Sequence, residues 1–553
     1  MRRLRLPITW RLWETPSLMG NRLRAIQRRF ETDLPLFALG NEGGVVLEIK
    51  PYLQPFEVRL AQLEAERLLG TQIRVEAGLG MCGAGTAADV ETLRERLTYW
   101  QRVGSDRLVP TRQVLFEASQ GGSEELEHRS SLHTARRLRY GPHDLHEYRG
   151  KFFPQLVRSL LNIAGACPGD TVFDPMCGSG TTLCEAVASG MNTVGSDLNP
   201  LSVLIARTKT LVVGLSPSEF RRKMREYRDS FKFGVAAPEL VWPADDLAYL
   251  QGWFDPFALN DIAAILAGVR RVRSQPYKDL LLVCLSNIIR AVSWQRLEDL
   301  RVRKEVREYA RGDAQARFLT ELDSQVDRIG CYLEMREGAK CGRLKGIFNV
   351  DAVAMGPELR NLAGTVDVLI TSPPYATALP YLDTDRLSLV ALGLLPRSRH
   401  RGTEANMVGT REITEAQRRE LWTSYMARRE ELPGEVTSLI DRVAEHNHGE
   451  GVGFRRRNLP ALLGKYYLAM LDAMRSARQM CRQGGRAFYV VGNNSTELSG
   501  QRIDIPTDRF LFEIGRLAGW RQRDFIAVEL LVSRDIFKEN RGSSESILCF
   551  EAA

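Results

Sequence analysis

A short strand followed directly by a glycine-rich turn and a helix is the feature that most constrains the fold of this chain. Residues 171–173 predict a buried strand, Asp174 begins the segment DPMCGSGTT, and residues 183–188 predict a helix. Gly178 and Gly180 allow the backbone to turn sharply and to approach a ligand closely, and the first N–H groups of the helix are left free to bind it. This unit predicts an α/β fold with a nucleotide-like cofactor at the loop.

The loop departs from two common phosphate-binding motifs. No lysine follows the glycines, which argues against a P-loop, and Leu183 occupies the place of the third glycine of a dinucleotide fingerprint. A second predicted strand, residues 193–196, ends in Asp197, 23 residues after Asp174. That spacing suits a carboxylate that binds ribose hydroxyls, although Asp197 could instead cap the helix that follows it.

A second motif follows another apolar run, residues 366–370, and reads Thr371, Ser372, Pro373, Pro374 and Tyr375. The exocyclic amine of a nucleobase is a poor nucleophile because its lone pair is conjugated into the ring, so two acceptors are needed to draw the nitrogen toward tetrahedral geometry. The Ser372 hydroxyl and the Pro373 carbonyl can be these acceptors, because paired prolines turn that carbonyl away from the strand ladder. Tyr375 then offers a ring face on which a flipped base stacks. A proline-terminated strand with a surface tyrosine is the alternative interpretation.

Together the two motifs resemble those of the S-adenosylmethionine-dependent amino-group methyltransferases, in particular the bacterial DNA N4-cytosine and N6-adenine enzymes. The resemblance covers roughly residues 143–550 and implies S-adenosylmethionine as the cofactor. It implies cofactor contacts from Asp174, Met176, Gly178, Gly180, Thr181 and, at the ribose, Asp197. It implies a catalytic role for Ser372, Pro373, Pro374 and Tyr375. Serine before the prolines is more usual in the N4-cytosine members, whereas Met176 departs from the phenylalanine that the family usually carries.

Three further segments fall where the same resemblance would place them. Lys151 and Phe152 resemble a turn that packs on the cofactor, although an ordinary helix start explains them as well. Asp351 ends a predicted strand, and the resemblance implies that it receives the adenine amino group of the cofactor. Asn493 and Asn494 follow a later predicted strand and are candidates for polar contacts in the target-base pocket.

The composition agrees with an intracellular enzyme. The chain has 553 residues, too many for one ordinary domain, and 44% of them are hydrophobic, enough for a substantial core. Its nine cysteines make an odd count and form no Cys-x-x-Cys pair, which favours reduced thiols without a zinc site. Neither a signal peptide nor a membrane span is recognisable, so the sequence predicts a cytoplasmic protein with no membrane partner.

Arginine clusters give the chain its basic character. The formal net charge is +8 and the pI is about 9.0, which fits a polyanionic partner without requiring one. Arginine suits phosphates because its fork is planar and always charged. Any one cluster could be a solvated helix face, but two lie in the polar segment after the second motif. We expect nucleic-acid contacts from Arg397, Arg399, Arg401, Arg455, Arg456 and Arg457.

The N-terminal part of the chain is predicted to be an accessory module of mixed α and β structure, residues 1–128. Its candidate strands are residues 44–49 and 72–77, and its candidate helix is residues 56–69. The polar segment 119–131, rich in glycine, serine and glutamate, is the expected linker.

Residues 129–553 are predicted to form a doubly wound, Rossmann-like methyltransferase sheet. A helical insertion at about 205–344 and a polar, basic insertion at about 396–460 are expected to interrupt it. An antiparallel hairpin beginning at residues 520–531, after a helix at 508–518, is expected to close the sheet.

These observations predict a site-specific DNA methyltransferase that acts on an exocyclic base amine, with cytosine N4 favoured over adenine N6. Two alternatives stay open. The tRNA guanine-N2 methyltransferases share the glycine loop and a Pro-Pro-Tyr loop, but they usually carry aspartate where this chain has Ser372. A binding protein of the same fold would hold cofactor or nucleic acid without methyl transfer, which the two intact loops argue against. The oligomeric state and a restriction or defence partner also stay open.

Overall fold

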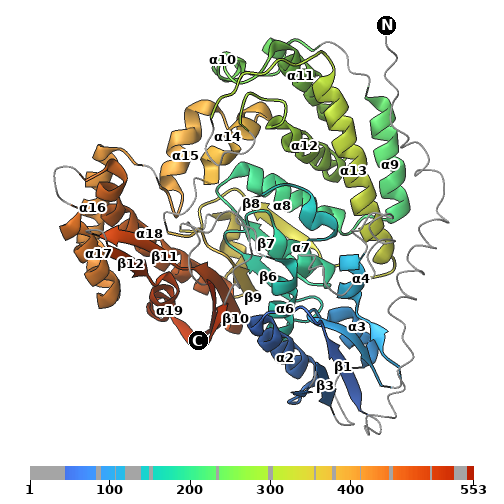
Figure 1. Cartoon of the computed structure of the whole chain (residues 1–553), viewed down its shortest axis with the longest axis vertical. Coiled ribbons are helices and arrows are strands. Elements are labelled where there is room, and N and C mark those ends of the chain that lie inside the picture. Colours follow the sequence, from blue (N-terminus) through green and yellow to red (C-terminus); the bar gives the residue numbers. More distant parts are fainter. Residues whose placement is uncertain are drawn as a thin grey trace.

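A seven-stranded mixed sheet forms the centre of the molecule (Figure 1). The computed structural model describes residues 44–76, 78–82, 89–105, 107–118, 139–148, 153–231, 236–296, 303–353, 357–376, 381–411, 413–447, 452–498, 501–528 and 545–553. In spatial order the strands of the sheet are β13 (Trp520–Val528), β14 (Glu545–Ala552), β10 (Cys481–Gly492), β9 (Val366–Thr371), β6 (Thr171–Asp174), β7 (Asn192–Ser196) and β8 (Leu344–Phe348). Neighbouring strands from β10 to β8 are parallel, whereas β14 runs antiparallel to both of its neighbours. The predicted doubly wound sheet is confirmed.

The chain changes its direction of travel across the sheet between β6 and β9. From β6 it moves outward to β7 and β8, and it then returns to the other side of β6 as β9 and β10. Open α/β sheets bind their ligands beyond the carboxyl ends of the strands at such a point. The glycine loop (residues 174–182) follows β6, and the Ser-Pro-Pro-Tyr loop (residues 372–375) follows β9, so both predicted motifs lie there.

Helices cover both faces of the sheet, which explains why its central strands are almost continuously apolar. Val172 and Ile370 contribute to a cluster with α6 (Pro154–Ala164) on one face. Phe173 and Leu369 contribute to a cluster with α18 (Phe454–Met480) and α19 (Thr507–Leu517) on the other. The alternation of side chains along β6 and β9 therefore divides the core into two layers.

The closing antiparallel pair is confirmed at the carboxyl-terminal end. Helix α19 is followed by β13, and β14 then inserts between β13 and β10. The described part of β13 ends at Val528, so residues 529–531 of the predicted strand lie outside the described residues.

A second sheet lies near the amino-terminal end. Its strands, all antiparallel to their neighbours, are in order β2 (Arg74–Glu76), β3 (Leu79–Cys82), β1 (Val45–Ile49), β4 (Trp100–Gly104) and β5 (Val109–Pro110). The accompanying helices are α2 (Pro55–Leu69), α3 (Val90–Arg96) and α4 (Arg112–Ala118). The two predicted strands and the predicted helix are confirmed, whereas the predicted linker lies outside the described residues.

The core of this second sheet is continuous with one face of the large sheet, because α2 packs on α6. Glu64 of α2 is fully buried and accepts hydrogen bonds from the N–H groups of Thr98 (3.0 Å) and Tyr99 (2.9 Å). It also accepts one from Nδ2 of Asn162 in α6 (3.1 Å). Burial raises the pKa of Glu64. A buried carboxylate therefore helps to join the two sheets.

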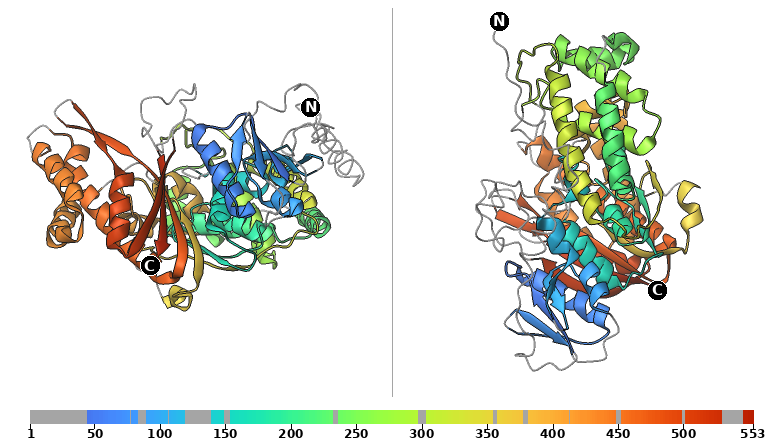
Figure 2. Two further views of the ribbon diagram at one scale, coloured as in Figure 1. Left: turned by 90° about the horizontal axis from the view of Figure 1, so that it is seen from below. Right: turned by 90° about the vertical axis from the view of Figure 1, so that its right-hand side faces the viewer.

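Two helical segments extend from the large sheet (Figures 1 and 2). Between β7 and β8 lie α8 (Pro200–Val212), α9 (Pro217–Ser230), α10 (Ala244–Gln251), α11 (Pro256–Arg270), α12 (Gln275–Ile289) and α13 (Asp313–Met335). Between β9 and β10 lie α14 (Tyr381–Ala391), α15 (His400–Asn406), α16 (Glu415–Arg428), α17 (Gly434–His446) and α18. Helix α12 packs on α8, α11 and α13, while α16 and α17 pack on α18.

Smaller elements complete the described chain. Helix α7 (Thr181–Ala188) follows the glycine loop, and the hairpin of β11 (Asn494–Leu498) and β12 (Gln501–Ile505) follows β10. Short stretches of tighter helix are η2 (Gly141–Asp144), η3 (Pro238–Leu240), η4 (Pro357–Leu362), η5 (Arg397–Arg399) and η6 (Arg429–Glu431). Among the helices that the structure describes, none has both the length and the apolar character that crossing a bilayer requires.

Candidate active site

The two predicted loops leave neighbouring strands at the same edge of the sheet. Strands β6 and β9 are parallel, with Phe173 opposite Leu369. The hydroxyl of Thr182, at the start of α7, donates to the carbonyl of Ile370 in β9 (3.2 Å). This bond ties the end of the glycine loop to the strand that carries the Ser-Pro-Pro-Tyr loop. Two segments far apart in sequence thus form one site.

Two glycines give the glycine loop a shape that other residues would strain. Gly178 has a φ of +47° and Gly180 a φ of +76°, which side chains with a Cβ rarely adopt. A Cβ at Gly180 would lie 2.6 Å from the Cα of Ala206 in α8, and one at Gly178 would lie 3.2 Å from the ring of Tyr148. Thr181, which is buried, begins α7 directly after Gly180. The close approach to α8 explains why glycine stands at position 180.

Asp174 ends β6 as a buried carboxylate with one oxygen unsatisfied. The residue is 1% exposed, and its Oδ1 accepts a hydrogen bond from the N–H of Met176 (3.2 Å). Its Oδ2 is buried and has no hydrogen-bond partner among the described residues. Burial, with a small contribution from the nearby carboxylate of Asp197, raises the pKa of Asp174 to about 7. A buried oxygen without a partner can accept a hydrogen bond from a bound ligand.

Asp197 follows β7 and faces the glycine loop. Its Oδ2 accepts a hydrogen bond from the N–H of Gly178, and its Oδ1 accepts one from the N–H of Asn199, both at 2.8 Å. Burial raises the pKa of Asp197 to about 6, against the effect of these bonds. Asn199 is the residue that caps α8, because its side chain accepts from the N–H of Leu201 (3.0 Å). The alternative that Asp197 is the helix cap is therefore wrong.

The Ser-Pro-Pro-Tyr loop presents two acceptors that the rest of the described chain does not use. Ser372 is half-buried and Pro373 is buried. Among the described residues, no hydrogen bond reaches the Ser372 hydroxyl or the Pro373 carbonyl. Both groups lie directly after β9, at the edge where Asp174 ends β6. The arrangement fits the binding of an amino group that donates two hydrogen bonds.

Contacts from the carboxyl-terminal strands hold this loop. The Tyr375 hydroxyl donates to Oε1 of Glu545, the first residue of β14 (2.7 Å). Asn494 donates from its side-chain amide to the carbonyl of Ala376. The side chain of Asn493 accepts from an N–H in the first turn of α19 (3.0 Å). Glu545 was not recognised from the sequence, because 170 positions separate it from Tyr375 and it belongs to no short motif.

Of the remaining predicted cofactor residues, two are described by the structure and two are not. Asp351 lies just after β8 and is half-buried, and its Oδ1 accepts from the N–H of Val353 (3.0 Å). Met176 is half-buried in the glycine loop. Lys151 and Phe152 lie outside the described residues. The three acidic residues Asp174, Asp197 and Asp351 thus lie at or just beyond the carboxyl ends of three adjacent parallel strands.

The predicted arginine contacts differ in their exposure. Arg399 and Arg401 are exposed, whereas Arg397 is half-buried with its guanidinium 5.1 Å from the ring centroid of Tyr249. The three arginines at the start of α18, Arg455, Arg456 and Arg457, are all exposed. Arg456 forms an ion pair with Glu497 of the β11–β12 hairpin (3.1 Å). The structure therefore leaves most of these side chains accessible to a partner.

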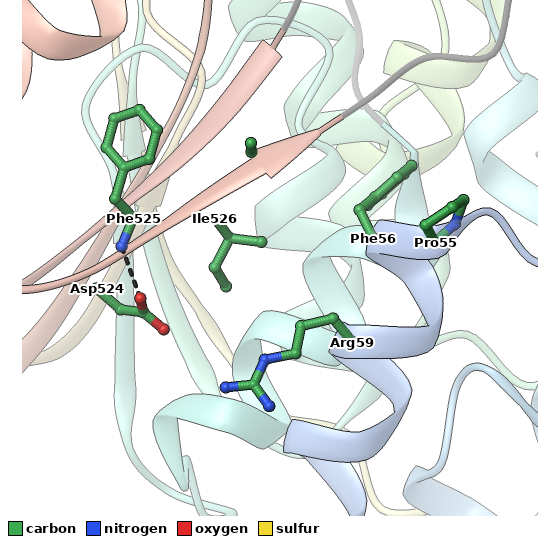
Figure 3. Close-up of a pocket in the computed structure, with 7 residues that line it drawn as sticks. Pro55, Phe56, Arg59, Asp524, Phe525 and Ile526 are labelled. Atoms are coloured by element: carbon green, nitrogen blue, oxygen red, sulfur yellow. Dashed lines mark hydrogen bonds between the residues drawn. The ribbon is translucent and has the colours of Figure 1, made fainter. Parts of the chain in front are cut away.

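A cavity of about 340 Å³ lies between α2 and the edge strand β13 (Figure 3). Its lining residues are Pro55, Phe56, Arg59, Asp524, Phe525, Ile526 and Ala527. Arg59 reaches from α2 toward β13 in Figure 3. None of the predicted site residues lines this cavity, so we do not assign it to the candidate active site.

Comparison with known proteins agrees with this geometry. Residues 145–212, which include the glycine loop, match the family described as RMKL-like, methyltransferase domain. The Type II methyltransferase M.BsoBI of Geobacillus stearothermophilus is 25% identical over 275 residues, 46% of this chain and 53% of that protein. The Type II methyltransferase M.MvaI of Kocuria varians is 20% identical over 385 residues, 67% of this chain and 80% of that protein.

A shorter stretch is similar to an RNA enzyme. The tRNA (guanine(10)-N2)-dimethyltransferase of Methanothermobacter thermautotrophicus is 40% identical over 52 residues, 9% of this chain and 16% of that protein. The chain spans about half the length of M.BsoBI, at 53%. In sequence the chain is therefore similar to Type II methyltransferases and, over a short segment, to a tRNA (guanine(10)-N2)-dimethyltransferase, and its glycine loop lies within a matched methyltransferase domain.

Proposed function

We propose that this protein transfers a methyl group from S-adenosylmethionine to an exocyclic base amine in DNA, with cytosine N4 favoured over adenine N6. The observation that carries the proposal is the parallel pairing of β6 with β9. This pairing sets a carboxylate and glycine loop suited to the cofactor beside a loop suited to the target amine. The serine in the second loop is the basis for favouring cytosine N4.

The residues of the first loop fit S-adenosylmethionine, the cofactor of this class of enzyme. Asp174 offers a buried, unsatisfied oxygen, and Gly178 and Gly180 keep the backbone free of side chains that would fill the loop. Asp197 is the proposed acceptor for the ribose hydroxyls, and Asp351 the proposed acceptor for the adenine amino group. Met176, Thr181, Lys151 and Phe152 are the further proposed contacts. The cofactor supplies a methyl group that its sulfonium already activates.

The second loop would bind and orient the amine. The Ser372 hydroxyl and the Pro373 carbonyl would accept its two N–H groups, which directs the nitrogen lone pair toward the methyl group. Pro374 stiffens the backbone between them and Tyr375, whose ring would stack on the flipped base. The nitrogen would attack the methyl carbon directly as the bond from that carbon to sulfur breaks and leaves a thioether, so no covalent enzyme intermediate is required; the amine would lose one proton to solvent. The loop contains no cysteine of the kind that methylation at cytosine C5 would need.

Duplex DNA would reach the site along basic surface. Arg455, Arg456 and Arg457 are exposed at the start of α18, and the Arg456 ion pair with Glu497 links this helix to the hairpin that follows β10. The same hairpin contacts the second loop through the bond from Asn494 to the backbone. Arg397, Arg399 and Arg401 form the second proposed phosphate-binding group.

A tRNA guanine-N2 methyltransferase is a rival function, because a segment of 52 residues is 40% identical to such an enzyme. Two observations weigh against it. The segment covers only 9% of the chain, and Ser372 stands where those enzymes usually carry aspartate. A protein that only binds cofactor or nucleic acid is a further alternative. The two rivals predict different products, label on tRNA in one case and none in the other.

The deciding experiment incubates the purified chain with methyl-labelled S-adenosylmethionine and either unmethylated duplex DNA or tRNA. The nucleic acid is digested to nucleosides, and the labelled base is identified by mass. Ser372→Ala tests the loop, and Ser230→Ala, an exposed serine at the end of α9, is the matched control.

Each outcome selects one function. Label on cytosine N4 or adenine N6 of DNA, lost with Ser372→Ala and kept with Ser230→Ala, would support the proposal. Label on tRNA guanine would favour the RNA enzyme. Cofactor binding without transfer to either nucleic acid would favour the binding protein.

A further inference from the structure

The ring of Tyr375 packs directly on the backbone of Gly492, where a side chain would displace it. A Cβ at Gly492, the last residue of β10, would lie 2.5 Å from the Cε2 atom and 2.8 Å from the Cζ atom of that ring. Real Cβ atoms do not approach other atoms so closely, so any larger residue would displace the ring. The backbone of β10 therefore limits the positions that the ring of Tyr375 can take.

Strand register places Glu545 at the same level of the sheet. Gly492 of β10 lies opposite Glu545 of β14, which in turn lies opposite Val528 of β13. The ring of Tyr375 crosses Gly492, and its hydroxyl donates to Oε1 of Glu545 at 2.7 Å. A hydrogen bond to a carboxylate is stronger than one between neutral groups. The ring of Tyr375 thus packs on Gly492 along one edge, and its hydroxyl bonds to the carboxylate of Glu545.

The backbone of the loop is fixed independently of this bond. Gly409 has a φ of +82°, and a Cβ there would lie 2.9 Å from the Cβ of Pro374 and 3.2 Å from the carbonyl oxygen of Tyr375. Asn494 donates to the carbonyl of Ala376. Loss of the Glu545 carboxylate should therefore release the ring of Tyr375 while the path of the loop is kept.

We propose that Glu545 is a positioning residue that orients the ring of Tyr375 for stacking on the target base. The inference rests on the function proposed above. A tyrosine side chain turns about two bonds, and a bond at its hydroxyl holds the ring plane before the base arrives. A ring that is already oriented does not lose that freedom when the base binds, so less binding free energy is spent on ordering it.

A double-mutant cycle tests the proposal through methyl transfer to unmethylated plasmid DNA. We expect Glu545→Ala and Tyr375→Phe each to lower kcat/KM for DNA about tenfold, as the loss of one charge-assisted hydrogen bond would. The double variant should be no worse than either single variant, because both remove the same contact. Glu545→Gln, which keeps an acceptor oxygen, should recover part of the loss. The Kd for S-adenosylmethionine should not change.

Glu551→Ala is the matched control, because Glu551 lies at the other end of β14 and pairs with Arg523 (2.5 Å). It should leave kcat/KM for DNA unchanged and should show no coupling to Tyr375→Phe. Effects of Glu545→Ala and Tyr375→Phe that multiply in the double variant would overturn the proposal. So would a fall in melting temperature that accounts for the loss of activity.

A second readout does not depend on activity. Protein labelled with 3-fluorotyrosine gives a ¹⁹F signal for Tyr375, identified as the one that Tyr375→Phe removes. That signal should shift in Glu545→Ala and stay in place in Glu551→Ala, and an unmoved signal in Glu545→Ala would overturn the contact. Absence of methyl transfer to DNA by the wild type would instead defeat the proposed function, and the ¹⁹F shift would still decide whether Glu545 anchors the ring.

Discussion

Replacement of Asp174 by asparagine should make the cofactor-free protein more stable at alkaline pH while weakening its cofactor binding. Burial raises the pKa of Asp174 from 3.8 to about 7. The folded protein therefore holds this proton more tightly than the unfolded chain does. Below about pH 4 both states are protonated and the carboxyl costs no stability. Between about pH 4 and pH 7 the unfolded chain ionises while the folded state keeps its proton, so stability falls across this range and reaches its lower limit above pH 7.

The size of the effect follows from the shift. About three pKa units at about 1.36 kcal/mol each give roughly 4 kcal/mol at pH 8, an upper value for one group. Asparagine has the same shape, can accept the N–H of Met176 and does not ionise. For 553 residues, an unfolding entropy of about 2.1 cal/mol/K per residue converts this to about 3 °C in melting temperature.

Thermal melting of wild type and Asp174→Asn between pH 4 and 8, without cofactor, measures the effect. The variant should match the wild type near pH 4 and melt about 3 °C higher at pH 8. Asp229→Asn, an exposed carboxylate in α9, is the control and should show no pH-dependent difference. A difference that is constant with pH, or a variant that is less stable at pH 8, would refute the assigned burial cost. Calorimetry should show weaker binding of S-adenosylmethionine at pH 8.

Three further predictions concern other parts of the molecule. Gly180→Ala should lower stability by about 1–3 kcal/mol and abolish cofactor binding, because its φ is positive and its Cβ would clash with Ala206; melting and calorimetry measure both effects. Replacing all three of the arginines 455–457 by serine should reduce the slope of log K for duplex DNA against log salt concentration by up to about three, and cofactor affinity should stay the same. Fluorescence anisotropy measures this slope, and an unchanged slope would show that these arginines do not contact DNA. Glu64→Gln should destabilise the protein by about 1–3 kcal/mol, because the new amide N–H group would face the N–H group of Asn162 Nδ2. Amide hydrogen exchange in α2 should become faster, and an unchanged exchange rate would contradict the role of Glu64 in joining the two sheets.

The central elements and both loops were predictable because their signals are local. The strand ending at Asp174 is a buried apolar run, and the glycines after it report the backbone angles of the turn. The loop after β9 was recognisable because two prolines restrict the backbone within four residues. The order of these units along the chain implied the parallel sheet, because strands joined through helices run in the same direction.

The structure decided what depends on distant partners. Asn199, and not Asp197, caps α8, a choice between neighbouring residues that capping chemistry alone did not make. The sequence predicted an accessory module, but it did not reveal that Glu64 of this module meets Asn162 in a shared core. Such contacts follow from how two elements pack, and packing is not encoded in any short segment.

By itself, the sequence determined the sheet, the glycine loop and the Ser-Pro-Pro-Tyr loop, because each is specified by the periodicity and backbone preferences of neighbouring residues. Only the tertiary structure showed that Glu545 holds the ring of Tyr375. That contact depends on the register of β14 against β10, which sets Glu545 opposite Gly492. Register is fixed by the packing of whole strands, so the partner of a side chain in the Ser-Pro-Pro-Tyr loop becomes visible only once the sheet is assembled.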